Sequence, residues 1–499
     1  MADIATIEQL AKKRGFFYPS DEIYGGLSGF YTYGHLGTLM KRKLENLWRK
    51  VFLKEENFFE IEPSIIMHEN VFKASGHLEF FVDPVAKCKK CGTIHRADSI
   101  VEEFLKRTYE GMTPKELTEL IKSNKIRCPK CKGELEEVGI LNMMFPLDIG
   151  AEKDLKGYLR PETAQGAYVS FSTQFNVLRK RLPLGLAIIG KAYRNEISPR
   201  QLIIRMREFT QAELQIFFDS DKINEHEKWN QIKNYKLIIY SVLGRNKKPV
   251  ELTCEEVVKG LKLPKFYVYY MAKVQQFFLE ALQVPKDKFR FKELSEDERA
   301  FYNKVHWDME LDLESLGGFK EIGGIHYRTS HDLSGHEKIS KQPQEIFFEN
   351  KKFVPHVLEL SFGIDRMLYS LLDLFYFKEK DKVVLKLPSI IAPITVSVFP
   401  LVNKDGLDKK AKEVYEILKN QFDIFFDDSG SIGRRYARAD EVGIPATVTC
   451  DHQTLEDSTV TIRDRDTTFQ IRAAIEDLKN ILWKFLEGEK LEKLGRIIK

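Results

Sequence analysis

The chain has 499 residues, and at ~100–200 residues per domain it is long enough for about two to four domains. Charged residues make up 30% and hydrophobic residues 43%, which is typical of a soluble globular protein. Because 78 Lys and Arg residues face 74 Asp and Glu, the net charge is only +4, and any RNA-binding surface must come from local patches.

Two segments bear on targeting. The N-terminus, MADIATIEQLAKKRG, lacks the apolar core of a signal peptide. The stretch Val383–Val402 is apolar apart from Lys386, but Pro388, Pro393 and Pro400 interrupt it. Because proline breaks a helix, we interpret this stretch as a linker that leads into a strand and expect a cytosolic protein without a membrane span. Six cysteines in such a chain favour metal ligation or buried thiols over disulfides.

The early part of the chain is expected to be helical, with an apolar face along Leu39–Leu53. Residues 85–140 form a Lys-rich segment with a cysteine pair near each end, which we interpret as a self-contained insertion. Inside it, TPKELTELIKS predicts a helix with Thr113 as N-cap, Pro114 at the first helical position and Glu116 completing a capping box.

The cysteine pairs are Cys88 with Cys91 and Cys128 with Cys131, each a CxxC. Two such pairs place four thiolates around a tetrahedral zinc ion, and a site closed by four cysteines is structural rather than catalytic. The alternative is four unligated thiols. The two remaining cysteines are isolated and are expected to be ordinary buried thiols.

Two strands, Gly185–Glu196 and Arg207–Phe218, are predicted on either side of a loop that contains Pro199. An antiparallel hairpin would gather the charged and aromatic side chains near its turn over one cleft. Arginines suit phosphate oxygens, a carboxylate accepts from an adenine amine, and an aromatic ring stacks on a base. The alternative is a salt-bridged hairpin surface. The side chains concerned are Arg194, Glu196, Arg205, Arg207, Glu208 and Phe209.

Two further fragments carry polar groups at element boundaries. In VLELSFGIDRML, a predicted strand holds Glu359 and Ser361 on one side and leads into an apolar helix with Arg366 near its start. A helix N-terminus with an arginine favours a phosphate. RPETAQG offers Glu162. The alternatives are an ordinary strand-to-helix turn with a solvated arginine, and a plain helix start.

Other nucleotide signatures are absent from the sequence. There is no GxxxxGK[ST], and GLSGF near Gly26 lacks the GxGxxG spacing. HLGT at His35 and KISK at Lys338 are similar to the HIGH and KMSKS signatures of class I synthetases. HLGT lacks the second histidine and a preceding apolar strand, and KISK has the polar character of a surface loop.

Residues 219–298 are charged and predicted to be rich in helix. After the proline-bearing linker, strands and helices alternate, which predicts a separate α/β module. Its predicted strands are TVSVFPLV, DIFFDD, PATVTC and STVTIRDR, and its predicted helices are LDKKAKEVYEILKN and RRYARADEV.

Together these fragments resemble class II aminoacyl-tRNA synthetases. GKAYRNE with REFTQAE is similar to motif 2, SFGIDR to motif 3, and Pro63 to the proline that ends motif 1, a dimer-forming element of that class. RPETAQG, RNEISPR and LELSFG extend the likeness, over essentially the whole chain, to glycyl-tRNA synthetases of the homodimeric archaeal and eukaryotic type. Leu360 stands where that family usually has proline, only Gly363 precedes Arg366 where some members have two glycines, and HYRTSHDL matches loosely.

The resemblance implies an α+β fold: a class II catalytic core with an antiparallel sheet flanked by helices, a zinc-binding insertion, and a C-terminal α/β anticodon-binding domain. DDSGSIGRRYARADEVGIP resembles the anticodon module shared with histidyl-, prolyl- and threonyl-tRNA synthetases. The implied domains are 1–84 (core with motif 1), 85–140 (zinc insertion), 141–390 (core with motifs 2 and 3 and a helical insertion at 219–298) and 391–499 (anticodon binding).

The implied reaction has two steps. Glycine's carboxylate attacks the ATP α-phosphate, and the 3′-hydroxyl of the terminal adenosine of tRNA(Gly) then attacks the adenylate. A carboxylate is already ionised, so catalysis should come from positioning and charge stabilisation. By resemblance Arg194 and Arg366 are the catalytic residues, Glu321 binds Mg²⁺ with ATP, and a second copy of the chain completes a homodimer. The implied ATP-binding residues are Arg194, Asn195, Glu196, Arg205, Met206, Phe209, Glu321, Ile322 and Arg366.

The implied glycine site must hold an ammonium and exclude larger substrates. Clustered acids suit both tasks, and because steric exclusion of larger amino acids is the easier form of discrimination, we expect no editing domain. The family's glycine-binding positions correspond to Glu162, Glu213, Glu359, Leu360 and Ser361. For tRNA, we expect Arg434, Arg435 and Arg438 on one helix to contact phosphates of the anticodon arm, the alternative being a solvated basic face.

Two other functions are open from the sequence. A non-catalytic nucleic-acid-binding relative, such as a polymerase accessory subunit, is expected to lose the adenylate-site groups, yet Arg194, Glu196, Glu213, Glu359 and Arg366 are all present. A class II synthetase for alanine or serine is disfavoured by the clustered carboxylates.

Overall fold

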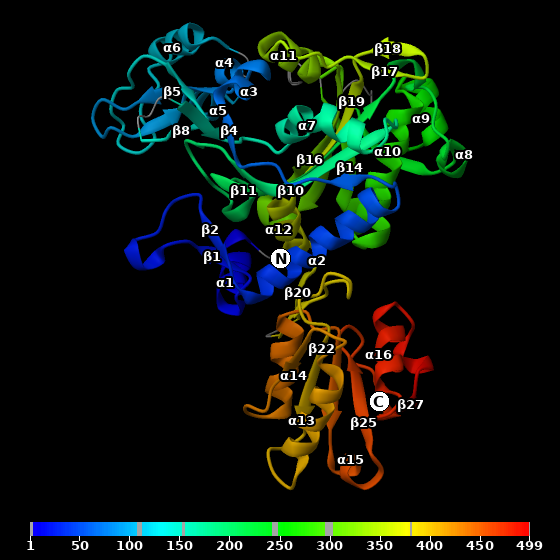
Figure 1. Ribbon diagram of the computed structural model, residues 1–499. Coiled ribbons are helices and arrows are strands. Elements are labelled where there is room, and N and C mark those ends of the chain that lie inside the picture. Colours follow the sequence, from blue (N-terminus) through cyan, green and yellow to red (C-terminus); the bar gives the residue numbers. More distant parts are fainter. Residues whose placement is uncertain are drawn as a thin grey trace.

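The computed structural model describes residues 3–106, 112–151, 155–241, 248–294, 303–379 and 382–498. Figure 1 shows a large N-terminal region built on a nine-stranded sheet and a smaller C-terminal region built on a six-stranded sheet. None of the helices in these ranges is both long and apolar enough to span a bilayer.

The nine-stranded sheet has the order β13-β12-β14-β15-β16-β19-β11-β10-β3 and is largely antiparallel, with the short strand β3 (Phe59–Glu60) at one edge. The predicted hairpin is confirmed: β10 (Leu184–Tyr193) pairs antiparallel with β11 (Glu208–Phe218). Next to it lie β19 (His356–Gly363), β16 (Gly318–Thr329) and β15 (Val305–Leu313). Segments far apart in the sequence thus form one continuous floor.

Alternation along β11 gives this sheet two different faces. Ala212, Leu214 and Ile216 point into the main hydrophobic core, so the side chains between them lie on the other face. The apolar face is covered by helices α2 (His35–Arg49) and α12 (Ile364–Leu374). Helix α7 (Ala164–Val177) packs against β10 and β11 and contributes to a separate hydrophobic cluster.

The segment 219–298, outside 242–247 and 295–298, is not helical alone. It contains α8 (Trp229–Ile232), α9 (Cys254–Gly260) and α10 (Lys265–Gln276), but its three strands also extend the central sheet. The strands are β12 (Lys236–Tyr240), β13 (Val250–Thr253) and β14 (Phe289–Glu293). The prediction missed them because they are only four or five residues long and lie among charged residues.

The cysteine-bearing insertion has a small core of its own, built from helices α5 (Ala97–Leu105) and α6 (Pro114–Ser123). The capping box between Thr113 and Glu116 is present as predicted. A three-stranded sheet completes the insertion, in the order β6-β5-β7. Its strands are β5 (Val82–Lys87), β6 (Ile94–Arg96) and β7 (Gly139–Asn142).

The C-terminal region has the sheet order β23-β22-β24-β25-β26-β27 and a separate core. The predicted strands are observed as β22 (Val396–Pro400), β23 (Ile424–Phe426), β24 (Ala446–Cys450) and β25 (Thr459–Asp464). The predicted helices are α13 (Leu407–Leu418) and α14 (Ile432–Glu441), whereas β26 (Gln470–Ala474) and β27 (Arg496–Ile497) were not anticipated.

The two regions also contact each other near the chain's N-terminus, where the end of helix α1 (Ile4–Arg14) approaches the end of α14. Lys13 and Arg14 form ion pairs with Glu441 of α14. Lys43 of α2 pairs with Asp423, 2.7 Å away, and adds a second polar link.

Candidate active site

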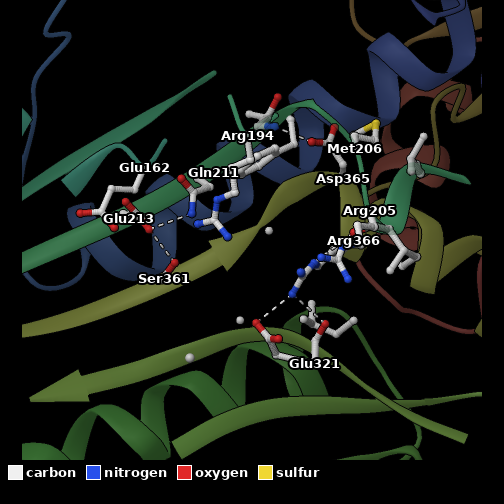
Figure 2. A pocket seen from close by; sticks show the side chains of 18 of the residues that line it. Glu162, Arg194, Arg205, Met206, Gln211, Glu213, Glu321, Ser361, Asp365 and Arg366 are labelled. Atoms are coloured by element: carbon white, nitrogen blue, oxygen red, sulfur yellow. Dashed lines mark hydrogen bonds and ion pairs between the residues drawn. The ribbon is translucent and has the colours of Figure 1, made fainter. Parts of the chain in front are cut away.

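A pocket opens where β11, β16 and β19 lie side by side, on the sheet face opposite the main core (Figure 2). Asn195 is absent from its lining, and Leu360 is fully buried in the core because side chains alternate along β19. The glycine-contact role predicted for Leu360 therefore does not hold for its side chain. The predicted residues that do line the pocket are Glu162, Arg194, Glu196, Arg205, Met206, Phe209, Glu213, Glu321, Ile322, Glu359, Ser361 and Arg366.

One end of the pocket is acidic, with Glu213 at its centre. Figure 2 shows Glu162, Glu213 and Ser361 side by side there. The Glu213 carboxylate accepts hydrogen bonds from Ser361 Oγ at 2.7 Å, from Gln211 Nε2 at 3.0 Å, and from the amide and hydroxyl of Thr163 at 3.0 and 2.7 Å. Strand register explains why Glu213 contacts Ser361, since the two residues lie opposite each other in the β11–β19 pairing. Burial and the neighbouring Glu162 raise the pKa of Glu213.

Behind this end lies Arg328, which the sequence analysis did not single out. Arg328 is 1% exposed, and its guanidinium donates to Asp332 at 2.8 and 2.9 Å and to Glu359 at 2.9 Å. It also lies 3.8 Å from Glu162 Oε1. The single buried charge of Arg328 therefore contacts two of the three predicted glycine-site carboxylates, those of Glu359 and Glu162.

The three carboxylates differ in their affinity for a proton. Burial raises the pKa of Glu162, but the neighbouring His77 and Arg328 outweigh it, and the net pKa is lowered. Burial raises the pKa of Glu359 to about 8, against the effect of Arg328 and with the help of Glu213. A cation entering this end would find ionised Glu162 and would stabilise the anionic forms of Glu213 and Glu359.

The middle of the pocket has a glycine floor. A Cβ on Gly324 would lie 2.6 Å from His326 Nε2 and 3.0 Å from His306 Nε2, and one on Gly323 would lie 2.2 Å from the Ser361 carbonyl oxygen. His326 lies opposite Glu359 in the strand register, with Nε2 3.6 Å from Glu359 Oε1. The strand that carries these two glycines therefore packs too closely against Ser361, His306 and His326 to accept a side chain at either position.

The other end of the pocket is rich in arginine. The Arg194 guanidinium lies between the rings of Phe81 and Phe209, 5.4 and 5.2 Å from their centroids, and Nε donates to the Pro161 carbonyl. Arg366 pairs with Glu321 at 2.8 Å, and Arg205 pairs with Glu196 at 2.6 Å. Figure 2 shows Arg194 directed toward the acidic end and Arg366 beside Glu321.

This geometry suits a polyanion next to a cation. Three guanidiniums within one pocket provide forked donors for phosphate oxygens. Asp365, which precedes Arg366, accepts hydrogen bonds from the Tyr33 hydroxyl and from the Thr210 amide. It thereby ties the start of α12 to the start of β11. Sequence reasoning missed Phe81, Thr210 and Asp365 because their contacts come from distant segments.

The four predicted zinc ligands meet in the insertion. The sulfur atoms of Cys88, Cys91, Cys128 and Cys131 all lie within 4.8 Å of one another, with 3.4 Å between Cys88 and Cys131 and 3.8 Å between Cys91 and Cys128. Tetrahedral zinc–thiolate bonds of about 2.3 Å require sulfurs about 3.8 Å apart, so the donor set fits zinc. The other two cysteines are buried elsewhere.

The arginines proposed for tRNA differ from one another. Arg435 is 2% exposed and donates to the carbonyls of Pro400 and Gly430, so its predicted phosphate contact is wrong: it holds α14 on β22. Arg438 forms a 2.6 Å ion pair with Asp427, and Arg434 is exposed. The KISK segment ends helix α11 (His331–Ser340) rather than forming a loop.

Comparisons with known proteins agree with this architecture. Residues 148–375 match the family model of the tRNA synthetase class II core domain (G, H, P, S and T), and residues 395–484 match that of the anticodon binding domain. The crystal structure of prolyl-tRNA synthetase from Cryptosporidium parvum covers 98% of this chain and 79% of that chain, with a TM-score of 0.60 and 14% identity, a likeness of fold. Fold and site together define a class II aminoacyl-tRNA synthetase.

Relatives along the full length narrow the class. The chain is 42% identical to the glycine–tRNA ligase of Thermococcus sibiricus, over 97% of this chain and 98% of the relative. It is 41% identical to that of Pyrococcus horikoshii over the same shares, and 38% identical to that of Methanocaldococcus jannaschii over 95% and 98%. The chain belongs to the glycine–tRNA ligase family, and these relatives favour an enzyme over a non-catalytic binding module.

Proposed function

We propose that the protein activates glycine with ATP and esterifies it to the 3′ end of tRNA(Gly). The observation that carries this proposal is the joining of a buried carboxylate cluster and an arginine cluster in one pocket. An α-amino acid presents an ammonium and a carboxylate, and ATP presents a chain of phosphates. Bound with the ammonium at the acidic end, the amino acid directs its carboxylate toward the arginines.

Each end of the pocket has its own task in this scheme. Glu162, Glu213 and Glu359 bind the glycine ammonium, with the Ser361 hydroxyl beside them. Arg194 contacts the ATP α-phosphate and stabilises the negative charge that develops during adenylate formation. Arg366 contacts an outer phosphate. Because the glycine carboxylate is already ionised, this step needs no general base.

The adenine part of ATP is assigned to the loop side of the pocket. Glu196 and the backbone at Met206 read the base edge, Phe209 stacks on the ring, and Arg205 approaches the outer phosphates. In the structure Phe209 faces the Arg194 guanidinium and Glu321 pairs with Arg366. ATP binding would therefore exchange these internal contacts for contacts to the nucleotide, with Glu321 free to take Mg²⁺.

Three further assignments complete the proposal. Zinc held by the four insertion cysteines is structural, because four thiolates leave no open coordination position. The motif 1 region around Pro63 forms a homodimer. The protein acts in the cytoplasm, where tRNA is charged, and Arg434 of α14 contacts the anticodon arm.

The direct test is a charging assay with labelled glycine, ATP, Mg²⁺ and a tRNA(Gly) transcript. Label is expected to become acid-precipitable and base-labile, as an ester requires, and to be lost with a transcript that lacks the terminal adenosine. An Arg194→Ala variant is expected to reduce charging at least 100-fold, the usual effect of removing a transition-state contact. Absence of charging by folded wild-type protein would overturn the proposal.

A further inference from the structure

A second pocket adjoins the first, between the cysteine-bearing insertion and the loop that joins β10 to β11. The insertion contributes Asp83, Arg96 and Ile100, and the loop contributes Ile197 and Arg200. Glu196 and Arg205 line both pockets, so the second pocket lies at the edge of the ATP site proposed above. None of the functions assigned so far uses it.

Asp83 is the unexplained group in this pocket. The residue is 5% exposed, and within the described part of the chain its Oδ2 has no hydrogen-bond partner. Arg96 lies 3.7 Å from Oδ1, but its guanidinium donates to Asp98 instead, at 2.9 Å. Burial raises the pKa of Asp83, since the carboxylate has lost water without gaining a donor. A ligand N–H at this position would supply the missing hydrogen bond.

The rest of the pocket narrows the chemical class of that ligand. Ile100 is buried and Ile197 half-buried, which gives apolar walls for the faces of a flat ring. Arg200 is exposed at the rim and has no ion pair among the described residues. A buried acceptor, apolar walls and a free arginine at the rim together suit a nucleotide whose base carries an exocyclic amine.

We propose that this pocket binds the cytosine of the penultimate nucleotide of tRNA. The 3′-hydroxyl of the terminal adenosine must reach the adenylate in the first pocket, so the preceding nucleotide lies at that pocket's edge. The unpaired end common to tRNAs is cytidine-cytidine-adenosine. The cytosine N4 amine donates to Asp83, whereas uracil would present its O4 acceptor to a buried carboxylate. The proposal rests on the ATP site assigned above.

Two tRNA(Gly) transcripts that differ only in a penultimate cytidine or uridine test this assignment. With zinc-replete, full-length protein, the kcat/KM of charging is expected to be about tenfold higher for cytidine, the usual value of one base-edge contact. In Asp83→Asn the amide can donate to uracil O4, so the preference for cytidine is expected to vanish or reverse. Glu103→Gln, which removes a carboxylate from an exposed position of the same pocket, is the matched control and is expected to keep the cytidine preference.

ATP–pyrophosphate exchange without tRNA is measured for every variant, so that a fault in the adenylate site is distinguished from a fault in the cytosine pocket. Zinc content reports whether the insertion is folded. Equal charging of both transcripts by the wild-type protein would overturn the proposal without any variant. A cytidine preference in Asp83→Asn as large as that of the wild type would also overturn it.

Discussion

Arg328 donates a 2.9 Å hydrogen bond to Glu359 with both side chains almost wholly removed from water. The pair joins strand β16 to strand β19 beneath the proposed ammonium site. Since Arg328 also binds Asp332 and lies near Glu162, one cation holds the carboxylate cluster in place. The carboxylate cluster is therefore preorganised to bind an ammonium, and this arrangement requires a network of buried charges.

Removing that cation is expected to destabilise the fold. In Arg328→Met the carboxylates of Asp332 and Glu359 lose their buried partner, a change that usually costs about 3–5 kcal/mol. The expected result is a large fall in the midpoint of urea unfolding followed by near-UV circular dichroism. Arg434→Met, at an exposed position of α14, is the control and should shift stability by less than about 0.5 kcal/mol. Equal midpoints for the two variants would contradict the assigned role of Arg328.

Glu213→Gln is expected to weaken glycine use with little effect on ATP. The amide nitrogen cannot accept the bonds that the carboxylate receives from Ser361, Thr163 and Gln211, and the ammonium loses a negative partner. A charged hydrogen bond contributes about 1.5–3 kcal/mol, so kcat/KM for glycine should fall by roughly 10- to 150-fold. Glu345→Gln, which changes an exposed ion pair with Lys352, should leave both Michaelis constants unaltered.

Glycine binding is expected to strengthen as the pH rises from 6 to 8. The pKa of Glu359 is raised from its ordinary value of 4.5 to about 8, so below pH 8 this carboxyl holds a proton that an incoming ammonium must displace. The KM for glycine should therefore fall with pH, by at most about tenfold per unit. Glu359→Gln should flatten this dependence. A wild-type KM that is constant from pH 6 to 8 would show that Glu359 is ionised throughout.

The raised pKa of Glu359 also affects the free energy of unfolding, which should fall as the pH rises. A carboxyl whose folded pKa is raised favours folding below its unfolded pKa, and this contribution is lost as pH rises toward 8. The unfolding midpoint of the wild-type protein is therefore expected to fall between about pH 4.5 and 8. The midpoint of Glu359→Gln, which has no carboxyl at this position, should fall less across the same window.

The cysteine cluster is expected to bind zinc. Cys91→Ser should lower the zinc content measured by atomic absorption, because it removes one of four ligands. Cys254→Ser, which changes a buried thiol elsewhere, should keep its zinc. Loss of metal should also make the segment around α5 and α6 more sensitive to proteases. Equal zinc content in the two variants would contradict the prediction that the four cysteines bind zinc.

Sequence patterns predicted the site residues whose positions depend on the local sequence of one element. The β10–β11 hairpin and the turn from β19 into α12 follow from the local sequence pattern, and Arg194 and Arg366 on them do line one pocket. Glu213 lines the same pocket, but it was predicted only from the resemblance to a known family. Arg328 was overlooked because its role depends on partners from α11 and β19. Arg435 was misassigned because a helical pattern does not reveal which basic side chain packs beneath its own helix.

The measurement closest to the central claim is amino-acid-dependent ATP–pyrophosphate exchange, with all twenty amino acids, purified protein, Mg²⁺ and no tRNA. The arrangement of Glu162, Glu213 and Glu359 beside Arg194 predicts exchange with glycine alone. Exchange driven by alanine or serine at a comparable rate would contradict the glycine site, and no exchange in folded, zinc-replete protein would contradict the adenylate site itself.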